Sequence, residues 1–323
     1  MIPQRLLRQF HVDLVAARKM VDAFMAACGL TGEPEFTCIY QSTDFKDRHV
    51  YKVIIADAAY ALKFDGRGAQ TRRLADEFDV LKRLHARFAA HKGLGVPQPI
   101  YADPDGAFFV TKFLDLKTAT DVVRDTDNDA EVARLYRRTA DWLGTFHGFG
   151  EVTKAAFWPN WMVESLAEAV ADGPQASPVD YQPMIAVTRL NAMQLAHKKC
   201  TKAQCHGDFH GRNIMIGGDE LYAFDVTEVT EKLAVYDIVD FLKDDIYREA
   251  MPEQIDASGV IRANREEFIA NYAYTIDPQI LEFCLRTRLL IDWVSITREM
   301  HAKSAFQRRK FDLLQLRLQI AFA

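Results

Sequence analysis

Strand-like and helix-like patterns occupy separate parts of this 323-residue chain, and that separation constrains the fold more than any other feature. Apolar and polar side chains alternate in three short runs at 36–40, 50–54 and 59–64, a period typical of antiparallel strands. A further strand pattern at 103–114 contains the turn signal Asp105-Gly106. Most of the remaining chain repeats its apolar residues at helical spacing. Strands gathered in one section and helices in another predict an α+β fold and argue against alternating βαβ units.

The expected helices lie on both sides of the strand patterns. One is expected at 5–28, ending near Gly29, and another at 70–91, before the helix-breaking sequence VPQPI at 96–100. Beyond residue 115, helices are expected at 129–148, 160–171, 181–199, 236–249, 264–274 and 278–300. A loop with two short strands, 213–216 and 221–224, interrupts this helical section at 203–227.

The length predicts two lobes, because a single compact core rarely extends over 323 residues. We expect an N-terminal helical extension at 1–34, a small lobe at 35–114 and a larger helical lobe at 115–323, with the boundary near Asp115. The first helix can pack on the small lobe or form a dimer contact, so the oligomeric state is left open.

Composition excludes several classes of protein. Hydrophobic residues make up 49% and charged residues 26% of the chain, as in folded globular proteins. The net charge is −5 with Lys and Arg scattered, so no nucleic-acid partner is expected. No apolar run reaches the roughly 18–20 residues of a membrane span, and the first residues lack a secretory signal, so no membrane association is expected. Five dispersed cysteines suit a reducing cytoplasm, and the spacing of Cys200, Cys205 and His206 matches no usual zinc motif.

The strongest local signal is HGDFHGRN at 206–213, followed by Asp225 at the end of an apolar strand. Phosphoryl transfer to a hydroxyl needs a carboxylate that orients the hydroxyl and takes its proton. It also needs hard oxygen ligands for Mg²⁺, which an Asn and an Asp supply. Asp208, Asn213 and Asp225 fit these roles if the loop and the following strands bring them together. The alternative is that Asp208 and Asn213 are turn residues, since Asp, Asn and Gly favour turns.

These motifs closely resemble the HGDxHxxN motif and the metal-binding Asp of the aminoglycoside phosphotransferase and choline kinase superfamily. The resemblance extends in order over most of the chain, through ALKF at 61–64, RRLADEFDVLKRL at 72–84, VPQPIYADPDGAFFVTKFL at 96–114, LGTFH at 143–147, HGDFHGRNIM at 206–215, FDVTE at 224–228 and DIVDF at 237–241. It implies a protein-kinase-like bilobal fold, in which a small lobe of antiparallel strands sits over a larger helical lobe with the nucleotide in the cleft.

The resemblance also implies a reaction, in which the γ-phosphoryl group of Mg²⁺-bound ATP passes to a hydroxyl of a small molecule. Asp208 would be the catalytic base or would orient the acceptor hydroxyl, and Asn213 and Asp225 would bind Mg²⁺. The resemblance implies supporting roles for the neighbouring side chains. His206 would hold the loop, and His210 and Arg212 would lie near the phosphates.

Lys63 would contact the α- and β-phosphates, and Glu77 would hold Lys63 in place. Backbone groups of Lys112, Phe113 and Leu114 would hydrogen-bond the adenine ring. The alternatives are a solvent-facing strand lysine at Lys63 and a solvated helix face at Glu77, with two competing carboxylates nearby at Asp76 and Asp79.

The sequence departs from the family pattern at the phosphate-covering loop. Residues 41–48 contain no glycine, so hydroxyls of Ser42 and Thr43, or the cations Lys46 and Arg48, would have to approach the phosphates instead. This departure leaves open a donor other than ATP, and it is the one support for a catalytically silent nucleotide-binding regulatory module. A protein Ser/Thr kinase is a third reading, which the Val226-Thr227 pair and the missing Ala-Pro-Glu pattern disfavour.

The acceptor is left open among amino sugars or aminoglycosides, other sugars, choline or ethanolamine, and amino alcohols. An aromatic wall for it can come from Trp158, Trp161 or Trp293, although packing roles compete. Acidic residues of the helical lobe can contact a cationic acceptor or form solvated faces; they are Asp237, Asp240, Asp244, Asp245 and Asp292.

Overall fold

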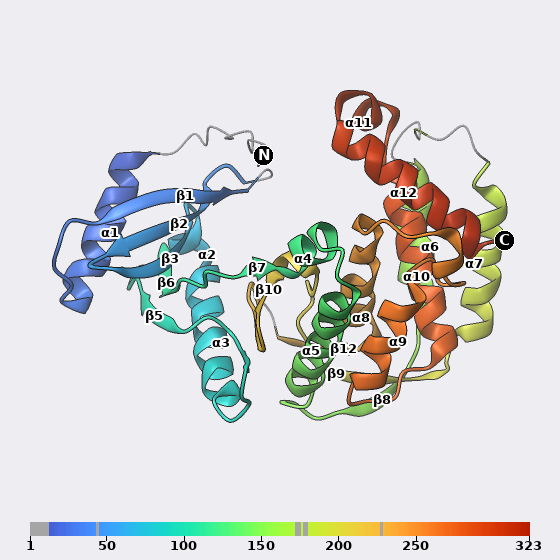
Figure 1. The fold of residues 1–323 in the computed structure, drawn as a ribbon, viewed down its shortest axis with the longest axis horizontal. Helices are drawn as coiled ribbons and strands as arrows, with labels where there is room; N and C mark the ends of the chain where they lie inside the picture. Colours follow the sequence, from blue (N-terminus) through green and yellow to red (C-terminus); the bar gives the residue numbers. More distant parts are fainter. Residues whose placement is uncertain (1–12, 43–44, 172–175, 177–179, 227–228) are drawn as a thin grey trace. The chain divides into compact units, whose positions relative to one another are not determined.

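The computed structural model of this chain describes residues 13–42, 45–171, 176, 180–226 and 229–323. The chain divides into two compact units, Met1–Asp115 with Ala223–Glu228, and Leu116–Tyr222 with Val229–Ala323. The first unit is built on an antiparallel sheet and the second is mostly helical (Figure 1). The predicted α+β fold class is therefore confirmed, while the division into three segments stays a prediction.

The sheet of the first unit has five strands in the order β1-β2-β3-β6-β5. The strands are β1 (Glu35–Gln41), β2 (Arg48–Ile55), β3 (Ala58–Asp65), β5 (Pro99–Ala102) and β6 (Phe108–Lys112), and the short β4 (Leu94–Gly95) belongs to another sheet. All the pairings inside this sheet are antiparallel. Strands β2 and β3 are joined by the two-residue turn Ala56-Asp57. Both residues have positive φ, because a two-residue hairpin turn needs this conformation to match the twist of the strands.

Two helices cover opposite faces of this sheet because neighbouring side chains on a strand point to opposite sides. Leu62 on β3 is fully buried in the cluster that Val21 and Phe24 of α1 (Leu14–Cys28) form with the sheet. The next residue, Lys63, contacts Glu77 of α3 (Arg73–Phe88) on the other face. One strand therefore supplies a core residue and the lysine predicted to bind nucleotide at adjacent positions.

The ends of these helices differ from the predictions for local reasons. The Asp13 carboxylate accepts from the backbone N–H groups of Val15 and Ala16 and so caps α1, whereas residues 5–12 of the predicted helix lie outside the described residues. The helix predicted at 70–91 is a short α2 (Gly68–Thr71) and then α3, because Arg72 takes a left-handed conformation with φ of 55°.

The second unit combines nine α-helices and three 3₁₀ turns with two small sheets among its described residues. Its helices are α4 (Ala119–Asp125), α5 (Asp129–His147), α6 (Asn160–Ala171), α7 (Gln182–Leu195), α8 (Val235–Leu242), α9 (Arg262–Asn271), α10 (Pro278–Val294), α11 (Arg298–Lys303) and α12 (Ala305–Ala321), with 3₁₀ turns at Gly211–Asn213, Lys243–Tyr247 and Pro252–Gln254. Its strands are β7 (Lys117–Thr118), β8 (Thr153–Ala156), β9 (Lys199–Cys205), β10 (Ile214–Gly217), β11 (Glu220–Ala223) and β12 (Thr230–Leu233).

Three of the predicted helices in this unit are wrong at their ends. The helix predicted at 181–199 ends at Leu195, because residues 199–205 form β9 and pair with β8 and β12. The segment predicted as one helix at 278–300 is α10 and α11, and the helix predicted at 236–249 ends at Leu242. Short apolar runs do not distinguish strand from helix by periodicity, so partners distant in sequence decide their form.

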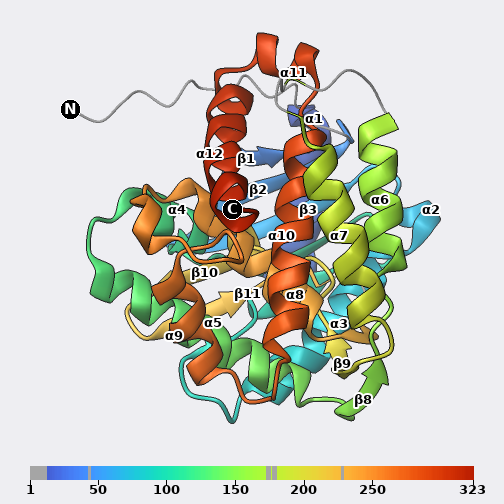
Figure 2. The same ribbon diagram turned by 90° about the vertical axis from the view of Figure 1, so that its right-hand side faces the viewer.

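Helix α10 is the centre of the helical unit. It contacts α6, α7, α8 and α12, and it lies between α7 and α12 in Figure 2. Many of its own side chains are buried, among them Phe283, Cys284 and Leu289. Among the described residues no helix is both long and apolar enough to cross a bilayer.

Candidate active site

The motif at 206–213 forms a loop between strand β9 and the 3₁₀ turn that leads into β10. Phe209 at its middle is fully buried and stacks on Trp142 of α5, with ring centroids 5.5 Å apart. Asp208, the residue before it, is exposed. The buried ring thus anchors the loop and turns the Asp208 carboxylate outward.

Asn213 and His210 both lie beside Asp208. The Asn213 amide Nδ2 donates to the Asp208 carbonyl oxygen at 3.0 Å and to its Oδ2 at 3.1 Å. His210 Nε2 lies 3.5 Å from the other carboxylate oxygen, while His210 Nδ1 accepts from the backbone N–H of Arg212 at 3.2 Å. Interaction with His210 lowers the pKa of Asp208 more than burial raises it, and Asn213 lowers it further. Asp208 is therefore an ionised carboxylate with a fixed orientation.

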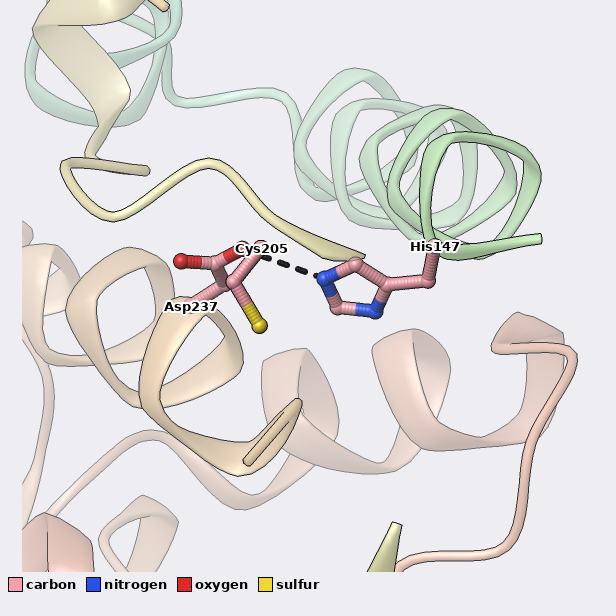
Figure 3. Close-up of side chains that lie close together, drawn as sticks. All are labelled: His147, Cys205 and Asp237. Atoms are coloured by element: carbon pink, nitrogen blue, oxygen red, sulfur yellow. Dashed lines mark hydrogen bonds and ion pairs between the residues drawn. The ribbon is translucent and has the colours of Figure 1, made fainter. Parts of the chain in front are cut away.

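The backbone just before Asp208 is held by Asp237 of α8. The Asp237 carboxylate is buried and accepts from the N–H of His206 at 2.7 Å and from the N–H of Gly207 at 2.9 Å. His147 contacts the same carboxylate at 3.1 Å (Figure 3). Its other ring nitrogen contacts the Tyr272 hydroxyl at 2.5 Å. Burial raises the pKa of Asp237, but His147, His206 and the Gly207 N–H outweigh burial, and the net shift is downward.

Cys205 lies beside His147 and Asp237, and the three could ligate a metal by distance alone, since their ligand atoms lie within 4.8 Å of one another (Figure 3). Burial raises the pKa of the Cys205 thiol strongly, whereas a metal ligand is the thiolate. The Asp237 oxygens already accept backbone N–H groups. The group is a hydrogen-bonded support for the loop, and it includes Cys205 but neither Cys200 nor the His206 side chain.

The far end of the loop is held by Asp244, whose Oδ2 accepts from the Gly211 N–H at 2.9 Å. Gly211 has no room for a side chain, because a Cβ there would lie 2.7 Å from Thr120 Oγ1 and 3.0 Å from the Thr120 nitrogen. The loop therefore passes in close contact with the start of α4 and has a carboxylate anchor at each end.

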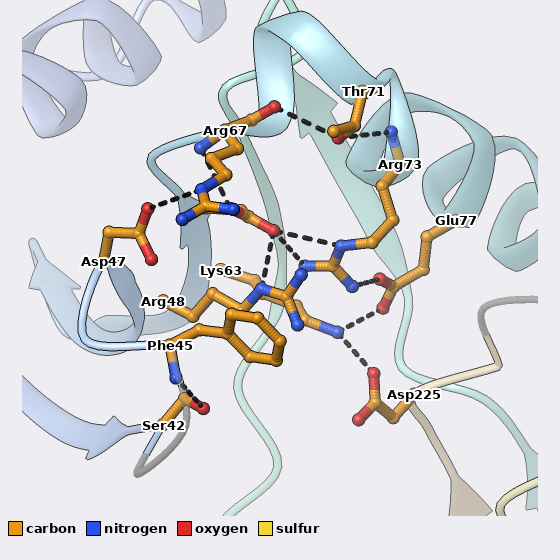
Figure 4. A network of polar contacts seen from close by, with 11 residues as sticks. Ser42, Phe45, Asp47, Arg48, Lys63, Arg67, Thr71, Arg73, Glu77 and Asp225 are labelled. Atoms are coloured by element: carbon orange, nitrogen blue, oxygen red, sulfur yellow. Dashed lines mark hydrogen bonds and ion pairs between the residues drawn. The ribbon is translucent and has the colours of Figure 1, made fainter.

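In the first unit, Lys63 lies between two carboxylates. Its Nζ contacts Glu77 Oε1 and Asp225 Oδ1, each at 2.5 Å (Figure 4). Glu77 is 4% exposed, and Arg73 also contacts its second oxygen at 3.5 Å. Burial lowers the pKa of Lys63, but the charges of Glu77 and Asp225 outweigh it and raise the pKa overall, so the amine stays protonated. Of the three acidic residues on this helix it is Glu77 that contacts Lys63, and Asp79 pairs with Lys82.

Asp225 has a backbone φ of 64°, in the left-handed region that Asp tolerates better than most residues. Such a conformation is retained where the surroundings fix it. Asp225 thereby brings its carboxylate to the Lys63 amine, although the two residues are 162 positions apart in the sequence.

The glycine-free loop is organised by its own contacts (Figure 4). Ser42 Oγ accepts from the Phe45 N–H at 3.1 Å, and the Ser42 N–H donates to the Arg48 carbonyl at 3.0 Å. The Arg48 guanidinium donates to buried Asp65 at 2.9 Å and lies 3.9 Å from the Phe45 ring centroid. Arg48 is thus committed to a structural pair, and Thr43 lies outside the described residues.

The predicted adenine-binding segment follows the last long strand of the first unit. The backbone N–H of Lys112 donates to Gln98 and that of Phe113 donates to Ala59, so two of the predicted donors are already used. Within the described ranges no carbonyl accepts from the Leu114 N–H. Leu114 is therefore the remaining donor of this segment.

The aromatic and acidic residues predicted to contact the acceptor differ in burial and in their partners. Trp293 is buried against Phe311, and Trp158 is exposed beside His197. Trp161 donates to the Tyr236 hydroxyl at 2.9 Å. Of the acidic residues, Asp237 and Asp245 are buried at 1% and 0% exposure, so the prediction that they form a solvated face is wrong for these two.

The supporting roles of His147, Asp237 and Asp244 were not predicted from the sequence. One sequence signal pointed to the two aspartates: Asp237, Asp240 and Asp244 repeat at helical spacing along one face of an otherwise apolar segment. The partner of that face, the loop at 206–213, lies about thirty residues away and is visible only in the folded chain.

Three solved structures illustrate what the chain is similar to. A spectinomycin phosphotransferase in complex with ADP and spectinomycin has a TM-score of 0.59 at 12% identity, over 95% of this chain and 97% of that one. An aminoglycoside 2'-phosphotransferase-IIIa in complex with GDP gives 0.60 at 16%, over 94% and 98%. A choline/ethanolamine kinase family protein from Mesorhizobium loti gives 0.58 at 14%, over 96% and 97%. These likenesses confirm the kinase-like fold.

A comparison with curated protein sequences gave no match. The model of the phosphotransferase enzyme family, APH, matches residues 43–268, which include Lys63, Glu77, the loop at 206–213 and Asp225. This span covers well over half of the chain. The chain therefore belongs to the phosphotransferase enzyme family and is a phosphotransferase that acts on a hydroxyl acceptor.

Proposed function

We propose that this enzyme transfers the γ-phosphoryl group of ATP, bound with Mg²⁺, to a hydroxyl of a small molecule. The observation that carries the proposal is Lys63, a partly buried strand lysine held between Glu77 and Asp225. A protonated amine held in this way is a preformed site for the phosphates of a nucleotide. Solved relatives of the same fold contain ADP or GDP, which supports a nucleotide donor.

Asp208 would act on the acceptor. Its carboxylate would accept the proton of the acceptor hydroxyl as the oxygen attacks the γ-phosphorus, while the bond from that phosphorus to the leaving ADP oxygen breaks. The contacts from Asn213 and His210 keep this carboxylate ionised and oriented. The two backbone anchors, Asp237 and Asp244, fix the loop that carries it, which is the positioning that phosphoryl transfer depends on.

The donor set fits a magnesium ion. Asn213 uses its Nδ2 for Asp208, and no group in the described ranges donates to its Oδ1, the atom that a metal would take. Asp225 supplies a carboxylate, and Mg²⁺ prefers such oxygen ligands together with phosphate oxygens. Asn213 and Asp225 would thus hold the ion, which would neutralise charge on the phosphates.

The remaining roles concern the nucleotide. Glu77 would keep Lys63 in place, and backbone groups of Lys112 and Leu114 would bind the base, with the Leu114 N–H as the donor that is not already used. Ser42 would face the phosphates through its hydroxyl proton, since its oxygen already accepts from Phe45. The cytoplasm stays the predicted location.

The proposal is tested by phosphate transfer from ATP across a library of hydroxyl-bearing metabolites, with and without Mg²⁺. Asp208→Asn is expected to lower turnover about 10²–10⁴-fold, because general base catalysis contributes a factor of this size. Asp219→Asn, at an exposed position of the same unit, is the matched control and should keep normal turnover. Near-normal transfer by folded Asp208→Asn protein would show that Asp208 has another role.

A further inference from the structure

The side of the catalytic loop that faces helix α8 carries a network of charges that the proposed reaction has not used. Asp237 holds the loop before Asp208 and Asp244 holds it after Asp208. Asp240 lies between them in sequence, at helical spacing and on the same face of the helix. Burial raises the pKa of Asp240, and the charges of Arg288 and Lys243 act against that rise.

Cations neutralise the carboxylates of this network. Arg288 of α10 donates to Asp240 Oδ1 at 2.8 Å, and Lys243 lies 3.9 Å from the same oxygen. Lys243 also donates to Asp292 at 3.1 Å, and Lys310 lies 4.0 Å from Asp292. Three cations therefore surround two carboxylates, and both carboxylates are already paired.

Arg288 has donors to spare and an aromatic neighbour. A guanidinium offers five N–H groups, and within the described ranges a single hydrogen bond, to Asp240, engages them. Its Cζ lies 5.9 Å from the ring centroid of Trp161, which is 37% exposed. Trp161 is fixed in turn by its hydrogen bond to Tyr236. The result is a partly exposed guanidinium beside an exposed ring, paired with Asp240 on the helix whose Asp237 holds the loop that bears Asp208.

This chemistry disfavours a polycation. Several ammonium groups of an aminoglycoside would have to separate Asp240 and Asp292 from their present partners and lie beside Arg288 and Lys243, and like charges brought together in this way are unfavourable. A carboxylate or phosphate instead matches the planar fork of a guanidinium, and a sugar ring or carbon chain can lie on the face of Trp161.

Resting on the proposed function, we propose that the acceptor carries an anionic group, a carboxylate or a phosphate, which Arg288 binds with support from Lys243. Arg288 is then a residue that determines acceptor specificity. This acceptor class differs from the spectinomycin that the similar solved phosphotransferase binds.

The first test compares matched acceptors with Mg²⁺ and ATP. Glucose, glucosamine, glucuronate and glucose 6-phosphate share a ring and differ in charge, a wider library of hydroxy acids is paired with the corresponding neutral amides and amino alcohols, and kanamycin and choline represent cations. Phosphorylated products are measured by mass spectrometry. The best anionic acceptor is expected to exceed its neutral and cationic counterparts at least tenfold in kcat/KM, and the carboxylate and phosphate arms identify which anion is bound. If no anionic member exceeds its counterparts, the inference is wrong.

The second test changes Arg288. Arg288→Met is expected to raise KM for the best anionic acceptor roughly 10- to 100-fold with KM for ATP unchanged, because a desolvated charged partner is lost. Arg288→Lys should recover part of this loss, since it keeps the charge but not the bidentate fork. Arg189→Met, at an exposed arginine of α7, is the matched control. An unchanged acceptor KM in Arg288→Met would overturn the inference.

Asp240→Asn is a second variant that tests the inference even if Arg288→Met fails to fold. If Arg288 binds an anion, release of Arg288 from Asp240 leaves KM for the anionic acceptor equal or lower. If Asp240 itself binds a cationic acceptor, the same variant raises KM at least tenfold, and the inference fails. Binding of Mg²⁺-ATP by calorimetry reports separately on the proposed function. Transfer that favours cations overturns only this inference, whereas an absence of both nucleotide binding and transfer overturns the proposed function as well.

Discussion

Replacing Asp237 with asparagine removes the charge that holds the backbone before Asp208. The carboxylate is 1% exposed and has three partners, the N–H groups of His206 and Gly207 at 2.7 and 2.9 Å and His147 at 3.1 Å. An asparagine side chain has one acceptor oxygen and a donating NH₂ group, so at least one buried donor loses its acceptor. A lost hydrogen bond to a charged group costs about 1.5–3 kcal/mol, and a buried unsatisfied donor costs about 1–3 kcal/mol.

Together these terms give a loss of roughly 3–5 kcal/mol, the range for breaking a buried charged contact. Each kcal/mol shifts Tm by about 2–4 °C in a unit of about 200 residues, so Asp237→Asn should melt about 6–20 °C lower in scanning calorimetry. Asp312→Asn, at an exposed position of α12, is the control and should change the free energy of unfolding by less than about 0.5 kcal/mol. Equal melting temperatures for the two variants would refute the role of Asp237 as a buried anchor.

The sign of the pH dependence gives a second check on the same anchor. The folded pKa of Asp237 is lowered, so its stabilisation is present above the ordinary Asp pKa of about 3.9 and is lost as the pH falls below that value toward the lowered pKa. The difference in stability between wild type and Asp237→Asn should therefore shrink as the pH falls below about 4. A difference that stays constant down to acid unfolding would contradict the assignment.

Three further predictions concern other parts of the site. Lys63→Met should lower kcat/KM for ATP roughly 10²-fold or more, measured by initial rates, and an unchanged value would remove Lys63 from the nucleotide site. Because interaction with His210 lowers the pKa of Asp208, His210→Gln should move the acid limb of the kcat/KM profile to higher pH, and an unmoved limb would separate the two residues. Gly211→Ala should destabilise the protein by about 1–3 kcal/mol through its clash with Thr120, and an unchanged melting temperature would show that the loop yields.

Local sequence was enough to predict the loop motif and the class of fold. The spacing of Asp208 and Asn213 lies within six residues, and the separation of strand and helix periods is a property of consecutive side chains. The contact between Lys63 and Glu77, 14 residues apart, was predicted from the family resemblance, although the composition of the helix left Asp76 and Asp79 as competitors. The strand-helix packing that turns Glu77 toward the sheet decided between them.

The sequence by itself determined the candidate site residues and the class of fold, because the loop motif and the strand alternation depend on neighbours along the chain. Only the tertiary structure decided what surrounds them. Strand β9 forms where a helix was predicted because its partners are distant in sequence, and Asp237 supports the loop because α8 packs beside residues 206 and 207. The pairing of Arg288 with Asp240 joins residues 48 positions apart, and it was packing between α8 and α10 that converted a row of acidic residues into a neutralised network.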